Sequence, residues 1–164
     1  MTGRFIFTLL DMLRLRSGPQ SLPAGWLAAT GLTFAYIGQG FVTDQIIGDT
    51  DGAPRSLVAI AFQFGAVALL LNLRDFQARL PQTLGALAGT GFLFGLMALF
   101  ILSRVVPGES QPDLALLYLL LFGWSLAVDA HIYRHALSVK YGLGALLAVL
   151  IFAANFILLK NLFG

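Results

Sequence analysis

The feature that most constrains this chain is a succession of apolar segments, each about as long as a bilayer core is thick. Five segments approach the roughly 20 apolar residues that a membrane-spanning helix needs, and they cover residues 24–47, 56–73, 83–103, 114–130 and 142–163. Only 11% of the residues are charged, against roughly 25% in a typical soluble domain. We therefore expect an all-α, polytopic membrane helix bundle with five transmembrane helices, forming a single integral membrane domain over residues 1–164.

Residues 1–17 predict an amphipathic interfacial helix that lies on the membrane before the first span. At 100° per residue, polar residues gather on one side and apolar residues on the other. The polar side holds Arg4, Thr8, Asp11 and Arg14, and the apolar side holds Phe5, Leu9, Met12 and Leu13. Gly18 and Pro19 end this helix. A helix that docks onto a partner protein is the alternative interpretation.

Lysine and arginine predict the orientation, because loops on the cytoplasmic side carry the excess of basic residues. With five spans, Arg55, Arg104 and Lys160 fall on one side, and the other side receives Arg4, Arg14, Arg16, Arg74, Arg79, Arg134 and Lys140. The N-terminus is therefore predicted to be cytoplasmic and the C-terminus outside. The cytoplasmic interface would hold Arg74, Asp75, Arg79, Arg134 and Lys140. A four-span alternative would make one segment re-entrant, and the second, which contains Gln63, is the weakest candidate.

The third apolar segment has the strongest packing signal. It spells "LGALAGTGFLFG", with Gly85 and Gly89 at one small-xxx-small spacing and Gly91 and Gly95 at another. Lipid tails are as apolar as leucine, so spans associate through close backbone approach and polar contacts. We expect this helix at the centre of the bundle, with the glycines packing inside the chain or, alternatively, forming a dimerisation face.

Polar residues inside the membrane are few, and each needs a partner or water. Gln39, Gln63 and Asn155 lie within the predicted spans, and we expect them mainly to form hydrogen bonds between helices. No predicted span carries a charge near its middle, which argues against a proton relay, an ion-coupled transporter or a voltage sensor. A constant offset of 57 residues matches Phe76 with Tyr133 and Leu80 with Leu137. This offset suggests a parallel repeat of a loop and its following span.

Both histidines of the chain lie in the stretch "DAHIYRHAL", where His131 and His135 stand four residues apart. On a helix they share a face and could reach one metal ion, but a catalytic zinc needs a third protein ligand. Asp129 lies about 200° around the helix from His131. A single haem ligand is conceivable. The leading interpretation is an interfacial segment with Tyr133, Arg134 and Lys140 at the headgroups, and a polar network with "RDFQAR" is a second.

The boundary patterns "FQARLPQTLGALAGTGF" and "YRHALSVKYGLGALLAVL", with five predicted spans and almost no soluble part, resemble the bacterial branch of the Yip family of five-span membrane proteins. The resemblance covers the chain from about residue 24 onward. It implies a multi-pass protein of the bacterial inner membrane whose role is organisational and involves lipids or partner membrane proteins. The long acidic N-terminal region of the eukaryotic members does not precede the first predicted span, so Rab-dependent traffic is not carried over.

These patterns favour a non-enzymatic protein that acts by association, as an assembly factor or accessory subunit of a membrane protein complex. We expect contact with the lipid bilayer and with other membrane proteins or a second copy, no nucleic-acid binding, no catalytic residues and no cofactor. A small transporter or lipid-translocating protein is the first alternative. A metal- or haem-binding membrane protein that uses His131 and His135 is the further alternative.

Overall fold

The computed structural model describes residues 2–48, 51–106 and 108–164, with side chains from Phe5 onward, so the side chain of Arg4 lies outside the described part. Over those ranges the chain is all-helical and contains no strand. The α-helices are α1 (Thr2–Leu13), α2 (Trp26–Ile47), α3 (Gly52–Leu73), α4 (Leu80–Leu102), α5 (Pro112–Leu137) and α6 (Tyr141–Phe163), and the short 3-10 turns are η1 (Pro19–Ser21) and η2 (Gln77–Arg79).

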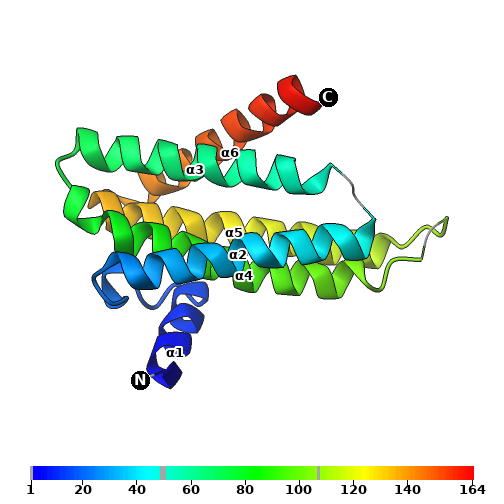
Figure 1. The fold of residues 1–164 in the computed structure, drawn as a ribbon, viewed down its shortest axis with the longest axis horizontal. Helices are drawn as coiled ribbons and strands as arrows, with labels where there is room; N and C mark the ends of the chain where they lie inside the picture. The colour runs from blue at the N-terminus through cyan, green and yellow to red at the C-terminus, as the bar shows by residue number, and fades with distance from the viewer. Residues whose placement is uncertain (1, 49–50, 107) are drawn as a thin grey trace.

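The long helices form a ring in which neighbours in space are not always neighbours in sequence. Helices α2, α4 and α5 lie side by side with α4 in the middle, while α3 and α6 cover one face of this layer (Figure 1). Helix α6 packs against α5 and α3, and α3 packs back against α2, which closes the ring. Helix α1 lies on the opposite face and contacts α4 and α5.

Among the residues that the structure describes, four helices are long and apolar enough to cross a membrane: α3, α4 together with η2, α5 and α6. The second predicted segment, which seemed weakest, is among them because α3 begins at Gly52 and has 22 residues. Helix α2 also has 22 residues but is not in this group. Gln39, Asp44 and several threonines and glycines lower its apolar character.

Three helices end at non-glycine residues in the left-handed backbone region: Leu15 follows α1, Asp75 follows α3 and Ser138 follows α5, with φ of 59°, 56° and 53°. In each case the amide of the next residue donates a hydrogen bond to a carbonyl five positions back, as in the bond from the Phe76 amide to the Leu71 carbonyl at 2.8 Å. These bonds satisfy carbonyls that a helix end leaves unpaired, which offsets the unfavourable φ.

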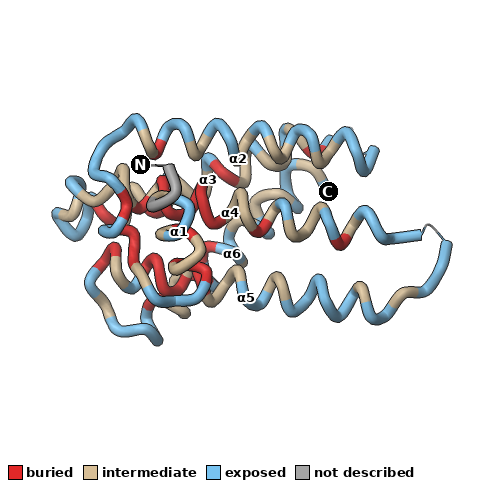
Figure 2. Tube along the Cα trace, turned by 90° about the horizontal axis from the view of Figure 1, so that it is seen from below, coloured by how far each residue is buried: buried red, intermediate tan, exposed pale blue. Residues whose placement is uncertain are grey.

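Burial is concentrated at one end of the bundle. Figure 2 shows the buried residues gathered at the end of the bundle near α1, while the far ends of α2, α4 and α5 are mostly exposed. The largest fully buried side chains include Met12 of α1, Leu71 of α3, and Val128, Ile132 and Tyr133 of α5. The bundle is therefore tightly packed at the end that holds η1, η2 and Ser138, and more loosely packed at the other.

Helix α4 occupies the middle of the bundle, and its glycines face α2. A Cβ atom added at Gly85 would lie 3.3 Å from the Ala29 Cα, and one added at Gly91 would lie 2.9 Å from the Tyr36 ring. Gly89 faces Leu9 and Leu32, and Gly95 lies against the side chain of Gln39. All four glycines thus make contacts within the chain, which is how small residues bring membrane helices close together.

Helices α6 and α5 cross closely at Gly144, backbone against backbone. A Cβ atom there would lie 2.5 Å from the Ala130 carbonyl oxygen and 3.1 Å from the Arg134 amide nitrogen, and neither backbone atom can move without moving the helix. Gly142, two residues earlier on α6, has open space at the same position.

We predict that Gly144→Ala destabilises the protein by about 1–3 kcal/mol, because the added methyl forces α6 away from α5. Gly142→Ala is the matched control, and it should leave stability unchanged or raise it slightly through its helix propensity. Thermal unfolding of both purified variants in one detergent measures the difference. Equal midpoints for the two variants would contradict the described crossing.

Candidate functional site

Asp129 lies at the edge of the fourth predicted segment, but it lies inside helix α5 in the structure. The fourth predicted segment ended at residue 130, but α5 continues to Leu137. Asp129 lies eight residues before that end, which is about 12 Å along the axis. The sequence predicts no charge near the middle of a span, and Asp129 lies between the middle and the end of α5, a helix apolar enough overall to cross a membrane.

The Asp129 carboxylate is held by a hydrogen bond from α3. The Gln63 side-chain amide donates to Asp129 Oδ2 at 3.3 Å and to the Tyr133 hydroxyl oxygen at 3.1 Å. Gln63 thus links α3 to α5, as expected of a polar residue between helices. Tyr133 is only 1% exposed, so its expected position at the lipid headgroups is wrong. Its stem helps fill the core while its hydroxyl group reaches Gln63.

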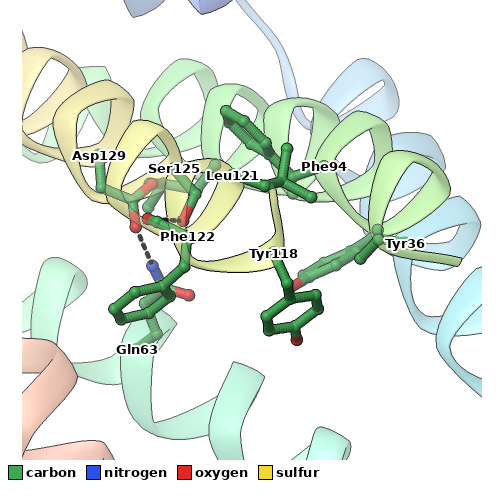
Figure 3. Close-up of a pocket in the computed structure, with 12 residues that line it drawn as sticks. Tyr36, Gln63, Phe94, Tyr118, Leu121, Phe122, Ser125 and Asp129 are labelled. Carbon is green, nitrogen blue, oxygen red and sulfur yellow. Dashed lines mark hydrogen bonds between the residues drawn. The ribbon is translucent and has the colours of Figure 1, made fainter. Parts of the chain in front are cut away.

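Asp129 and Gln63 border a cavity of about 220 Å³ between α2, α3, α4 and α5. On α5 four of the lining residues recur every three or four positions, at Tyr118, Phe122, Ser125 and Asp129, so they form one stripe along the helix, and Leu121 lies beside it. Figure 3 shows Asp129 and Gln63 at one end of this cavity and the rings of Tyr36 and Tyr118 toward the other. We call this space the Asp129 cavity.

The three predicted polar residues of the spans lie in different places. Gln39 donates to the Thr43 hydroxyl oxygen at 2.7 Å within α2, and Asn155 of α6 donates to the Ala59 carbonyl oxygen of α3 at 3.0 Å. Only Gln63 borders the Asp129 cavity. The suggested repeat is also wrong as a structural repeat, because Phe76 precedes η2 in a loop whereas Tyr133 lies inside α5.

The two histidines are in contact with each other, and their face of α5 points toward the N-terminal segment. Their ring centroids are 4.5 Å apart, edge to face, and His131 Nε2 lies 3.1 Å from the Ser17 carbonyl oxygen. His131 is buried, so it does not sit among headgroups. Asp129 faces Gln63 instead, and within the described ranges no group of three or more His, Asp or Glu residues is placed to hold a metal ion.

The basic residues of the predicted cytoplasmic interface connect the two loops. Arg79 donates hydrogen bonds to the Ala136 carbonyl oxygen at 2.9 Å and to the Ser138 hydroxyl oxygen at 2.7 Å, and Arg74 reaches the Leu137 carbonyl oxygen at 3.5 Å. The Arg79 guanidinium also lies 4.1 Å from the centre of the Phe76 ring. Cations stabilise a helix C-terminus, so Arg79 caps α5. The remaining residues of the set, Asp75, Arg134 and Lys140, are exposed.

Helix α1 is attached to the bundle through α5. The predicted apolar side is present, but Leu9, Met12 and Leu13 are buried against the protein. Trp124 Nε1 donates a hydrogen bond to the Leu13 carbonyl oxygen at 2.8 Å, and the Trp124 ring packs edge to face against Phe94 at 5.3 Å. With the His131 contact to Ser17, α5 therefore holds the N-terminal segment at two points.

The side of α2 that faces away from α4 carries small residues without neighbours. Gly31 and Gly38 are exposed and have nothing within 4 Å of an added Cβ atom. Ala35, Val42 and Gln45 continue this line at spacings of three or four residues, and all are exposed. We call these five residues the outer face of α2.

We predict that Trp124→Phe loosens α1, because it removes one hydrogen bond worth about 1 kcal/mol while keeping an aromatic ring. Trypsin should then cleave after Arg14 and Arg16, both exposed, roughly fivefold faster. Trp26→Phe is the matched control, because it makes the same exchange at a tryptophan that is 57% exposed. It should leave the rate of trypsin cleavage unchanged. Cleavage at equal rates in both variants would argue against this anchor.

Comparisons with protein-family models, with curated proteins and with solved structures found no match.

Proposed function

We propose that this chain is a non-enzymatic, multi-pass membrane protein that acts by association, as an assembly factor or accessory subunit of a membrane protein complex. The partner contact is a transmembrane helix of another membrane protein, and it packs on the outer face of α2.

The observation that carries this proposal is the contrast between two sets of glycines. Those of α4 are covered by α2 and, at Gly89, also by Leu9 of α1, whereas Gly31 and Gly38 of α2 meet open space. Glycines on a helix surface let another backbone approach closely, and this approach supplies the van der Waals contact that lipid-embedded helices need to associate. Disordered lipid tails make less complete van der Waals contact with such a glycine-bearing helix face than a second, rigid helix does. A partner helix fits the outer face of α2 better than lipid does.

The proposal requires α2 to be in the membrane as a fifth span. Its length supports this placement, since 22 residues of helix extend about 33 Å. Its packing beside α4, a helix long and apolar enough to cross, is a second argument. Its exposed side chains Leu27, Phe34 and Ile46 are a third, because they are apolar where water would favour polar residues.

Five spans place the N-terminal segment and the α3–α4 loop on the same side of the membrane, which the excess of basic residues makes the cytoplasmic side. The C-terminus then lies outside. The chain has no cysteine, so single cysteines can report topology. We predict that Ser21→Cys and Gln77→Cys are both protected from an impermeant maleimide in intact cells, while Asp51→Cys and Glu109→Cys react. Reaction of Ser21→Cys together with Asp51→Cys would show that α2 does not cross.

The resemblance to the bacterial Yip branch supports the same role. What that resemblance implies, a protein of a bacterial inner membrane with an organisational role among lipids and membrane proteins, agrees with the proposal. The resemblance contributes no catalytic residue, and the association proposal needs none.

The association proposal is tested by purification from native membranes in a mild detergent, at endogenous level, with mass spectrometry of co-purifying proteins. We predict a defined partner set that Gly31→Leu and Gly38→Leu each weaken roughly tenfold or more, because overpacking a close contact costs about 1–3 kcal/mol. Gly65→Leu is the matched control, since Gly65 is an exposed helix glycine with open space on α3.

Three results separate the possible outcomes. Recovery of the protein alone would remove the support for association, and retention of partners by both α2 variants would exclude the outer face of α2 as the contact. A particle of two copies that Gly38→Leu splits would make the partner a second copy of this chain. Metal and haem analysis of the same fraction tests the alternative centred on His131 and His135.

A further inference from the structure

The Asp129 carboxylate borders a cavity and has no basic side chain paired with it in the described part of the chain. The carboxylate accepts a hydrogen bond from the neutral amide of Gln63. In the part of the chain that the structure describes, no lysine, arginine or histidine forms an ion pair with it. Arg134, five positions along α5, is exposed, and Arg79 of the adjoining loop is bonded to the end of α5 instead. A carboxylate taken out of water without a counter-charge is costly, so a cation bound beside it would offset that cost.

The cavity is polar at one end and aromatic at the other. From Asp129 to Tyr118 the α5 stripe covers 12 residues, or roughly 16 Å of helix from the first to the last. Ser125 lies along this stripe, and Tyr36 and Phe94 border the same space from α2 and α4 (Figure 3). The glycines at positions 91 and 95 form part of the α4 wall, so backbone lines the cavity there.

The lining identifies the class of ligand. A divalent metal ion would need several oxygen ligands, yet the lining contains one carboxylate, and the amide that contacts it is a donor. An anion would face the carboxylate. An organic ammonium suits both ends, because it pairs with the carboxylate and because aromatic faces attract cations. A volume of about 220 Å³ admits a small molecule, just below the roughly 300–1,000 Å³ of drug-sized sites.

We infer that the Asp129 cavity binds a small organic cation, an ammonium group that carries an apolar arm. Asp129 is the counter-ion, Gln63 orients its carboxylate, and the rings of Tyr36 and Tyr118 surround the apolar arm. This site is separate from the association contact, because Tyr36 lies on the α4 side of α2 while Gly31 and Gly38 lie on the opposite side. The two proposals can therefore fail independently.

Phenyltrimethylammonium is the probe, and tert-butylbenzene is its neutral isostere of the same shape. Binding to the full chain in nanodiscs of a zwitterionic lipid is measured by calorimetry, with empty nanodiscs as the blank. We expect saturable binding of the cation and at least tenfold weaker binding of the neutral compound. Asp129→Asn should weaken cation binding at least tenfold. Asp113→Asn, which removes an exposed carboxylate at the start of α5, should leave it unchanged.

A second variant keeps the test valid if Asp129→Asn does not fold. Ser125→Leu fills the middle of the stripe while leaving the carboxylate in place, and it should abolish binding. Tryptophan emission reports whether each variant retains the contact between Trp124 and Phe94, a residue that borders the cavity. Equal affinity for the charged and neutral probes, unchanged cation affinity in folded Asp129→Asn, or no saturable binding by the natural sequence would each overturn the inference.

Discussion

The close approach of α2 to α4 is the contact on which the rest of the bundle depends. Gly85, Gly89, Gly91 and Gly95 remove the side chains that would hold these helices apart, and Ala29, Tyr36 and Gln39 fill the space. Because the hydrophobic effect does not drive association between helices in lipid, such fit has to supply the attraction. The contact also sets the rotation of α2. One side of α2 then borders the Asp129 cavity, and its outer face, with Gly31 and Gly38, meets open space.

The two ends of the bundle have different physical characters. At the closed end, Arg79 caps α5, Phe76 packs under Arg79, and Trp124 and His131 hold the segment that follows α1. The basic groups there act on helix ends and rings, so they are not paired with Asp129. Toward the other end the helices are more exposed, and the Asp129 cavity extends in that direction from its carboxylate. An acid without a counter-charge beside a tightly packed end is a suitable place to recognise a cation.

Much of the helical architecture was predictable from the sequence, while several side-chain roles were not. Four of the five apolar segments correspond to helices long and apolar enough to cross a membrane, and the remaining segment, residues 24–47, forms α2. The end of α5 was misjudged because His131, Arg134 and His135 look like a boundary, whereas that helix continues to Leu137. Tyr133 looked like a headgroup anchor for the same reason, yet it is buried against Gln63. The 57-residue offset aligned apolar residues but did not align helices with helices or loops with loops, since apolar composition recurs in any set of spans.

The sequence by itself determined that the chain is helical, apolar over most of its length, and equipped with glycines at regular spacing on one segment. These are local properties, since hydropathy and helical periodicity depend on neighbours along the chain. Only the tertiary structure decided that the α4 glycines face α2, that Asp129 faces Gln63 and a cavity, and that His131 faces Ser17. The physical reason is that lipid and core are equally apolar. Hydropathy therefore cannot say which face of a span is turned inward, and that rotation is set by the fit of whole helices against one another.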